Sequence, residues 1–154
     1  DNDGAVALHY AIAHSDLQLC KSLITSTTAQ ATDTRGVHPL LIAAQRSSVQ
    51  VELLLLLLLI VEKLLKAGAP VHLQSHDGLS PLRAAAISRN EPVLKFLLEY
   101  LRKNDEELKM DEPDLDGVPL IHTLLVLRDA SMVTTLFEYG ASAKARDSHG
   151  RSCA

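Results

Sequence analysis

One stretch decides the fold: Ser75-His76-Asp77-Gly78-Leu79-Ser80-Pro81-Leu82. Gly78 allows the positive φ of a tight turn, because glycine has no Cβ to clash with the backbone. Ser80 can accept a hydrogen bond from a free helix amide, and Pro81 suits the first helical position, where no amide donor is needed. The small residues at 84–86 then let a second helix pack closely. The stretch therefore predicts a turn that leads directly into a short helix.

The same turn recurs along the chain. Its glycines are separated by 32, 42, 39 and 33 residues and are Gly4, Gly36, Gly78, Gly117 and Gly150. These spacings predict a repeat of about 33 residues, with insertions in the second and third units at about 48–57 and 101–110. We expect one array of units at about 1–32, 33–74, 75–113 and 114–146, with a truncated fifth at 147–154. The chain has the appearance of a piece of a longer array.

Each unit is expected to hold two helices. In the first unit they are predicted at about 6–13 and 17–26, and polar residues at 25–28 lead outward. In the second unit a capping box of Ser47 and Gln50 predicts one long helix over about 48–67, ended by Gly68. In the third unit the second helix starts at Asn90, runs on by a turn and is followed by a charged surface loop. In the fourth unit the second helix carries apolar residues at 132–137.

The long helix contains an unbroken apolar run at 53–61. Nine residues are too few to span a membrane, which takes about 20, and Glu52 and Lys63 flank the run. A helix that is apolar on every side must be covered on every side. We expect either the chain's own insertions or a partner to cover it.

Composition excludes several classes of protein. The chain has 154 residues, of which 47% are apolar and 22% charged, and this excludes disorder. The net charge of −4 argues against nucleic-acid binding, which needs a basic face. Cys20 lies in an apolar periodic stretch and is expected to be a buried free thiol. Together with the lack of a signal peptide, this predicts an intracellular protein, in the cytoplasm or nucleus.

The residues that carry chemistry in other proteins are scattered here. His72 and His76 lie four apart on a predicted turn without further ligands nearby, which argues against a metal site. His14, His38 and His149 are expected to be solvated. The acidic stretch at 105–107 is expected to be a solvated loop, and no phosphate-binding loop or activated nucleophile is recognisable. We therefore expect no metal, no cofactor and no enzyme activity.

The repeat resembles the ankyrin repeat, whose pattern is an Asp and a Gly followed by Thr-Pro-Leu-His and an Ala pair. The matching positions are Gly4, Leu8, His9 and Ala11; Asp33, Gly36, Pro39, Leu40 and Ala43-Ala44; Gly78, Ser80, Pro81, Leu82 and Ala85-Ala86; and Gly117, His122 and Gly140-Ala141. Leu41 and Arg83 depart from the pattern, because they replace the histidine. The resemblance implies an all-α solenoid of stacked helix-turn-helix units with short β-turn or hairpin connections. It also implies that His9 and His122 bond neighbouring backbone.

The resemblance further implies a protein–protein recognition scaffold, which binds its partner through turn tips and the concave surface of the inner helices. At the tips the implied partner-binding residues are Asn2, Asp3, Thr34, Arg35, His76, Asp77, Leu115, Asp116, Ser148 and His149. On the inner helices they are Ala13, His14, Gln45, Arg46, Ile87, Ser88, Val126 and Leu127. The alternative is a structural module for self-association or inter-domain docking through the leucine-rich helix at 53–61. Its docking residues would be Leu53, Leu56, Leu57 and Ile60, since exposed apolar surface usually marks an interaction site.

Overall fold

The computed structural model describes residues 2–46, 50–106, 108 and 110–152. Over these residues the chain is helical, without strands, and its extended pairings are the isolated bridges Pro113–Pro119 and Arg146–Ser152. The helices are α1 (Asn2–Ala13), α2 (Leu17–Leu23), α3 (Ser26–Gln30), α4 (Pro39–Gln45), α5 (Val51–Lys66), α6 (Pro81–Ile87), α7 (Glu91–Lys103), α8 (Leu120–Val126) and α9 (Ala130–Glu138). The all-α fold class predicted from the sequence is confirmed.

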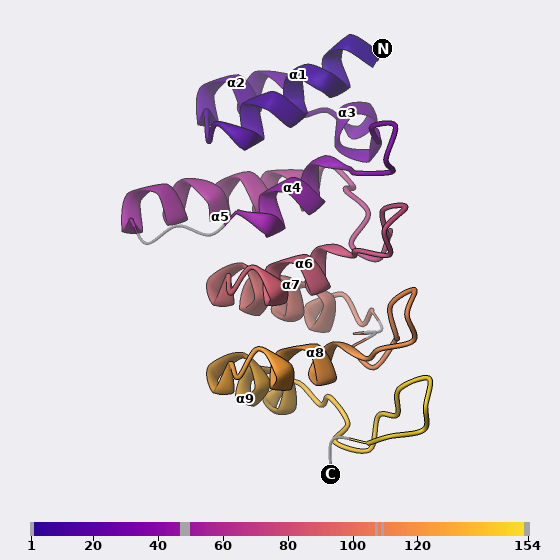
Figure 1. The fold of residues 1–154 in the computed structure, drawn as a ribbon. Coiled ribbons are helices and arrows are strands. Elements are labelled where there is room, and N and C mark those ends of the chain that lie inside the picture. The colour runs from indigo at the N-terminus through magenta and orange to yellow at the C-terminus, as the bar shows by residue number, and fades with distance from the viewer. Residues whose placement is uncertain (1, 47–49, 107, 109, 153–154) are drawn as a thin grey trace.

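The helices form pairs that are stacked from the N-terminus to the C-terminus (Figure 1). Helices α1, α4, α6 and α8 pack on one another in that order and make one layer. Helices α2, α5 and α7 pack in order in the second layer, and the short α3 packs against α1 and α4. The two layers meet within each pair, as α1 with α2, α4 with α5, α6 with α7 and α8 with α9.

The core between the layers consists of aliphatic side chains. Its largest fully buried members are Leu8, Ile12, Leu40, Leu41, Ile60, Leu64, Leu94, Leu97, Leu98, Leu101, Ile121 and Leu124. Each contributes about 1.5–3 kcal/mol through burial alone. Alanines in α4 and α6 are buried where these two helices pack, as the small residues predicted. Cys20 is a free, buried thiol as predicted, and burial, with the nearby charge of Asp16, raises its pKa to about 11.

Four of the five predicted glycine turns are present. We call the segments 33–36, 75–78, 114–117 and 147–150 the tips. Each tip ends in a glycine of positive φ, namely Gly36 at 73°, Gly78 at 74°, Gly117 at 76° and Gly150 at 76°. The tips form a column beside the helices (Figure 1).

The fifth predicted turn is wrong. Gly4 lies inside α1, which begins at Asn2 and not near residue 6. Gly4 costs about 1 kcal/mol relative to alanine in a helix. Burial of Leu8 and Ile12 of the same helix in the core outweighs that cost. Unlike Gly36, Gly78 and Gly117, Gly4 has no proline two or three residues later to fix a helix start there.

The second helix of the first unit is shorter than predicted. Helix α2 ends at Leu23, and a separate helix α3 occupies residues that were expected to lead outward. Thr25 and Thr28 form a reciprocal capping box, in which each side chain accepts from the other's backbone amide at 3.1 and 2.8 Å. This box starts α3 and separates it from α2.

The leucine-rich helix α5 begins at Val51, later than the predicted residue 48. Gln50 precedes it without a side-chain capping bond, and Ser47 of the predicted capping box lies outside the described residues. Gly68 follows the helix with φ 86°, as predicted for a left-handed cap. Helix α7 starts after the cap Asn90, whose side chain accepts from Val93, and ends at Lys103. None of the described helices is long and apolar enough to cross a membrane.

Candidate functional site

The tips are built by one repeated set of hydrogen bonds. Asp33 Oδ1 accepts from the amides of Arg35 and Val37, both at 2.8 Å. In the same way, Asp114 and Asp147 each accept hydrogen bonds from the backbone amides of the second and fourth residues after them, at 2.9–3.0 Å. In the second tip Ser75 replaces the aspartate and accepts from the Leu79 amide at 3.3 Å. Each tip is therefore held by its own first side chain.

These bonds set the pKa values of the tip carboxylates. Burial acts to raise the pKa of Asp33, but the amides of Val37 and Arg35 and the Arg35 side chain together lower it. The amide and side chain of Arg151 and the amide of His149 outweigh burial and lower the pKa of Asp147 to about 2. Both carboxylates are thus charged, and both accept hydrogen bonds within their own turns.

Successive tips pack in register. A Cβ on Gly36 would lie 2.8 Å from the His76 ring, one on Gly78 would lie 2.6 Å from Leu115 Cγ, and one on Gly117 would lie 2.5 Å from Ser148 Cβ. The His76 amide donates to Arg35 O and the Ser148 amide to Gly117 O, both at 2.9 Å. In each of the last three tips, the second residue therefore covers the glycine of the preceding tip.

We call α1, α4, α6 and α8 the inner helices. A second set of bonds links these helices, or the residue just before one, to the segment that comes after each helix pair. His9 Nε2 bonds Val37 O at 2.9 Å and His122 Nε2 bonds Ala145 O at 3.0 Å, as the resemblance implied. His38 Nε2 bonds Leu73 O at 3.1 Å. Leu73 lies two residues before the tip at 75–78, just as Ala145 lies two residues before the tip at 147–150. A ring nitrogen thus links units in three places.

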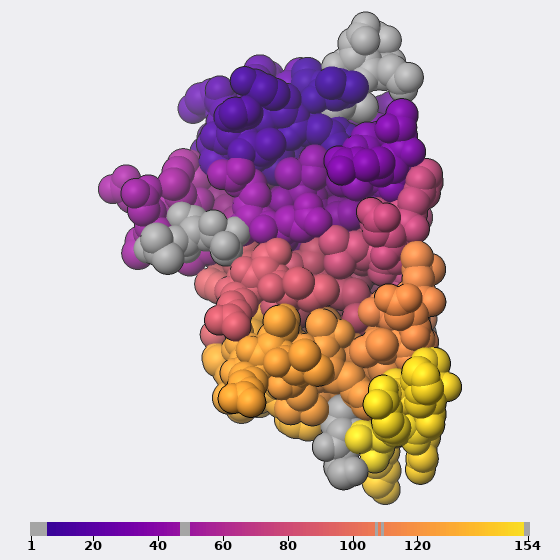
Figure 2. All heavy atoms as spheres, in the orientation of Figure 1, coloured from indigo at the N-terminus to yellow at the C-terminus, as the bar shows by residue number. Residues whose placement is uncertain are grey.

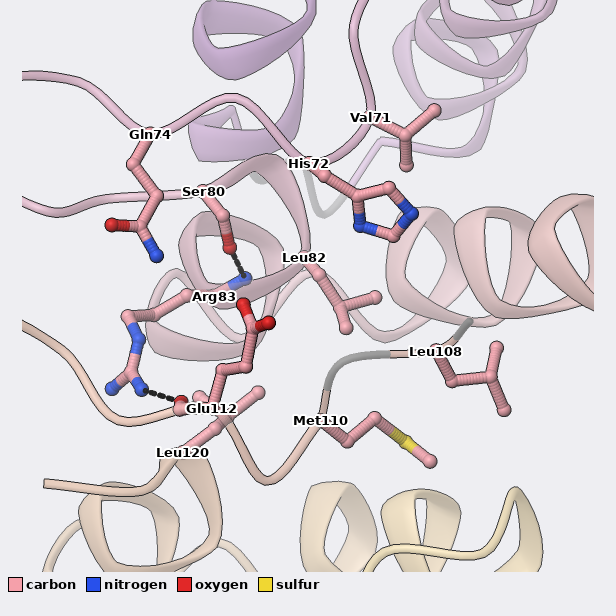
Figure 3. Close-up of a pocket in the computed structure, with 10 residues that line it drawn as sticks. All are labelled: Val71, His72, Gln74, Ser80, Leu82, Arg83, Leu108, Met110, Glu112 and Leu120. Carbon is pink, nitrogen blue, oxygen red and sulfur yellow. Dashed lines mark hydrogen bonds between the residues drawn. The ribbon is translucent and has the colours of Figure 1, made fainter. Parts of the chain in front are cut away.

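Arg83 replaces the histidine in the third unit and makes more bonds than an imidazole can. Its guanidinium donates to Glu112 O at 3.1 Å, Val118 O at 3.0 Å and Asp114 Oδ2 at 3.3 Å, while the residue is 5% exposed. Burial lowers the pKa of Arg83, and the charge of Asp114 opposes that shift. Figure 3 shows the guanidinium reaching the Glu112 carbonyl beside a cavity of about 20 Å³. That volume suits one water molecule and not a substrate.

His38 was expected to be solvated, and this expectation is wrong. The residue is fully buried, and its Nδ1 has no hydrogen-bond partner among the described residues. Burial lowers the pKa of His38; the bond to Leu73 opposes this shift and the neighbouring His9 adds to it. The imidazole is therefore held neutral between the second and third units.

The burial of His38 gives a pH-dependent stability. Its folded pKa is below the unfolded value, so below about pH 6.5 the unfolded chain binds a proton that the folded chain excludes. We expect the free energy of unfolding to fall between pH 7 and pH 5.5, with His38 contributing at most about 1.4 kcal/mol per pH unit. Urea denaturation at several pH values measures this. His38→Thr should flatten the profile and His14→Thr, at an exposed position, should not; equal profiles in both variants would contradict the assignment.

The predicted inner-helix residues lie at the carboxyl ends of α1, α4, α6 and α8 and in the residues just beyond. Side chains of neighbouring units bond the carbonyls there: Arg46 donates to Ala13 O, Asn90 to Arg46 O, and Arg89 to Leu127 O at 3.2 Å. The ends of the inner helices are therefore tied together, as the tips are.

We call these helix ends and the tips together the inner face. Val126 is 82% exposed on it, Ile87 and Gln45 are exposed, and Ala13, Arg46, Ser88 and Leu127 are half-buried. His14 is exposed and its ring contacts the ring of Tyr10 in a tilted arrangement, with centroids 4.1 Å apart and planes at 42°. Eight predicted tip residues are exposed, namely Thr34, Arg35, His76, Asp77, Leu115, Asp116, Ser148 and His149. Asn2 and Asp3 were predicted as tip residues and instead belong to α1.

The inner face has a groove beside α1. It encloses about 540 Å³ and is lined by Val6, His9, Tyr10, Ala13, Thr32, Asp33, Thr34, Arg35 and Ile42. The groove brings predicted residues of both kinds together, with Ala13 from an inner helix and Thr34 and Arg35 from a tip. Val6 and Tyr10 were not predicted, although they lie four residues apart on one helix face and are exposed.

The predicted docking residues of the leucine-rich helix are in part wrong. Leu57 and Ile60 are buried in the core, and Leu53 and Leu56 are half-buried. The exposed apolar residues of α5 are Val51, Leu55 and Leu59. Within the described ranges, no group of three or more His, Cys, Asp or Glu side chains is placed to hold a metal ion.

Comparison with known proteins relates the chain to part of a longer protein. No protein-family profile matches the chain. The chain is 27% identical over 151 residues to the nuclear factor NF-kappa-B p105 subunit of Rattus norvegicus. The match covers 96% of this chain and 15% of the relative's length. Nearly the whole chain thus resembles a short part of a much longer subunit.

Proposed function

We propose that the chain is an ankyrin-like repeat array that recognises a partner protein through its inner face. The observation that carries the proposal is that exposed apolar side chains, Tyr10, Ile87 and Val126, recur along the inner face between tips that are held in register. A surface fixed by bonds between units loses little conformational entropy on binding. The relative is itself a subunit, which is consistent with a role in protein assembly.

The proposed action is binding and not catalysis. Asp33 and Asp147, whose pKa values are lowered, hold structural bonds in the tips, and Arg83, His38 and Cys20, whose pKa values are shifted by burial, lie in the core. The other shifted pKa values belong to surface pairs, namely Glu62 with Lys66, Glu91 with Lys95, and Tyr139 with Glu99. The cavity beside Arg83 has room for only one water molecule. The groove beside α1 is larger, and its exposed apolar lining suits side chains of a partner protein.

The experiment is affinity capture from cell lysate with matched variants. Arg35→Glu, Asp116→Arg and Val126→Glu change exposed residues of the inner face, and Lys95→Glu changes an exposed residue of α7 as the control. We expect a partner whose capture falls at least tenfold with the inner-face variants and is unchanged with the control, while circular dichroism shows that each variant is folded. Capture that survives all three inner-face variants would contradict the proposal.

A second candidate function uses a different surface. Val51, Leu55 and Leu59 are exposed on α5, which favours self-association or inter-domain docking through the leucine-rich helix. This surface includes none of the inner-face residues.

A further inference from the structure

Helix α5 carries an exposed apolar stripe. Val51 is 70% exposed, Leu55 57% and Leu59 45%. Residues spaced by four lie on one face of a helix, so the three side chains form a continuous row. Helix α5 extends beyond its neighbours on the left of the stack in Figure 1, and the same end projects from the surface in Figure 2. The stripe thus begins on the part of the helix that stands clear of the rest.

The stripe is separate from the face that holds α5 in the stack. Leu57, Ile60, Val61, Leu64 and Leu65 are buried against the core. The helix therefore has two apolar faces, of which one packs within the chain and the other is in contact with solvent. A large exposed apolar patch on a folded protein usually marks an interaction site.

The neighbouring helix α7 shows that the solvent-facing side of a helix in this layer does not require apolar residues. Lys95, Glu99 and Arg102 are exposed on α7, and Lys95 pairs with Glu91 at 2.7 Å. Helix α7 packs beside α5 in the same layer. A helix of this layer can therefore expose charged residues to solvent, whereas α5 exposes an apolar stripe instead.

The charges at the ends of α5 indicate the partner. Glu52 lies in its first turn. In its last turn Lys66 pairs with Glu62 of the same helix at 2.6 Å, and Lys63 is an exposed cation that faces outward beside this pair. Two such helices laid antiparallel place Glu52 of one near Lys63 of the other, twice by symmetry, with the leucines between them. Parallel pairing would set like charges side by side. Charge complementarity thus favours a second copy of the same helix in the antiparallel orientation.

We propose that two copies of the chain associate through their α5 helices, antiparallel, with Val51, Leu55 and Leu59 at the contact and Glu52–Lys63 pairs at its ends. Sixteen helical residues span roughly 24 Å. One helix pair of this length buries less than the roughly 1,600 Å² of a standard stable interface. An interface smaller than the standard size favours a weak, reversible dimer. The proposed dimer does not use the inner face. The dimer and the recognition of a partner protein can therefore be tested independently of each other.

Sedimentation velocity over protein concentrations from the low micromolar to several hundred micromolar tests the contact. We expect a monomer–dimer equilibrium in the wild type and at least a tenfold weaker one in Leu55→Lys. Val126→Lys replaces a still more exposed apolar residue of the inner face and should leave the equilibrium unchanged. Circular dichroism confirms that each variant is folded. A wild type that stays monomeric throughout, or dimerisation that Leu55→Lys does not weaken, would overturn the proposal.

A charge exchange tests the orientation. Glu52→Lys alone and Lys63→Glu alone each set like charges together at both ends of an antiparallel dimer and should weaken it several-fold. The double variant, with both changes, restores opposite charges and should return the dissociation constant to near the wild-type value. A double variant that is as weak as the single ones would rule out the antiparallel arrangement.

Discussion

Arg83→Met is expected to lower the free energy of unfolding by about 3–5 kcal/mol, the usual cost of removing one partner of a buried charge pair. The variant leaves the Asp114 carboxylate without its cation and the Glu112 and Val118 carbonyls without their donor. An array of this size has about 5–15 kcal/mol in total, so the loss is large. Urea denaturation followed by circular dichroism measures it.

Two further variants test whether the cost of Arg83→Met comes from the loss of its hydrogen bonds. One removes an exposed arginine as a control, and the other restores one of the bonds. Arg35→Met removes an exposed arginine that also pairs with an aspartate, at 3.3 Å, and should cost less than about 1 kcal/mol. Arg83→His restores the residue that the ankyrin pattern has at this position and should recover part of the loss, because His122 makes the equivalent carbonyl bond. If Arg83→Met were as stable as Arg35→Met, the third and fourth units would not be joined as described.

Gly117→Ala is expected to cost about 3 kcal/mol. Alanine at a positive φ costs about 1–2 kcal/mol, and the added Cβ would lie 2.5 Å from Ser148 Cβ, an overpacking that costs about 1–3 kcal/mol. Gly150 has the same φ of 76°, but a Cβ there meets nothing within 4 Å. Gly150→Ala should therefore cost only about 1–2 kcal/mol.

A double-mutant cycle isolates the contact between tips. Ser148→Gly removes the Cβ that the new methyl group would strike, so in that background Gly117→Ala should cost no more than Gly150→Ala does. Equal costs of Gly117→Ala with and without Ser148→Gly would show that the tips do not pack on one another.

Much of the fold could be predicted from the sequence because its turns need glycine. Gly36, Gly78, Gly117 and Gly150 all adopt the positive φ for which glycine is suited, so their spacing locates the tips. Gly4 matches the same spacing but is helical, because the conformation of a glycine also depends on its neighbours: a proline stands two or three residues after Gly36, Gly78 and Gly117, and none stands there after Gly4. The start of α3 depends on two threonine side chains that cap each other, a signal that is present in the sequence but less conspicuous than a glycine turn.

The candidate site was less predictable, for two physical reasons. Burial of His38 depends on how two units pack; its place before Pro39 marks a helix start but does not by itself show that the side chain is buried. In α5, seven consecutive leucines give no contrast between faces, so periodicity could not show that Leu57 is buried and Leu55 exposed. The exposed tip residues, by contrast, could be located directly from their places beside the glycines.

Amide hydrogen exchange at the tips tests the in-register column most directly. The amides of His76 and Ser148 donate to the preceding tip, at 2.9 Å each. The amide of Leu115, at the equivalent position, makes no such bond among the described residues. NMR should show exchange at His76 and Ser148 at least tenfold slower than at Leu115, relative to unfolded reference rates. Equally fast exchange at all three amides would contradict a column of stacked tips, and with it the rigid inner face proposed for partner recognition.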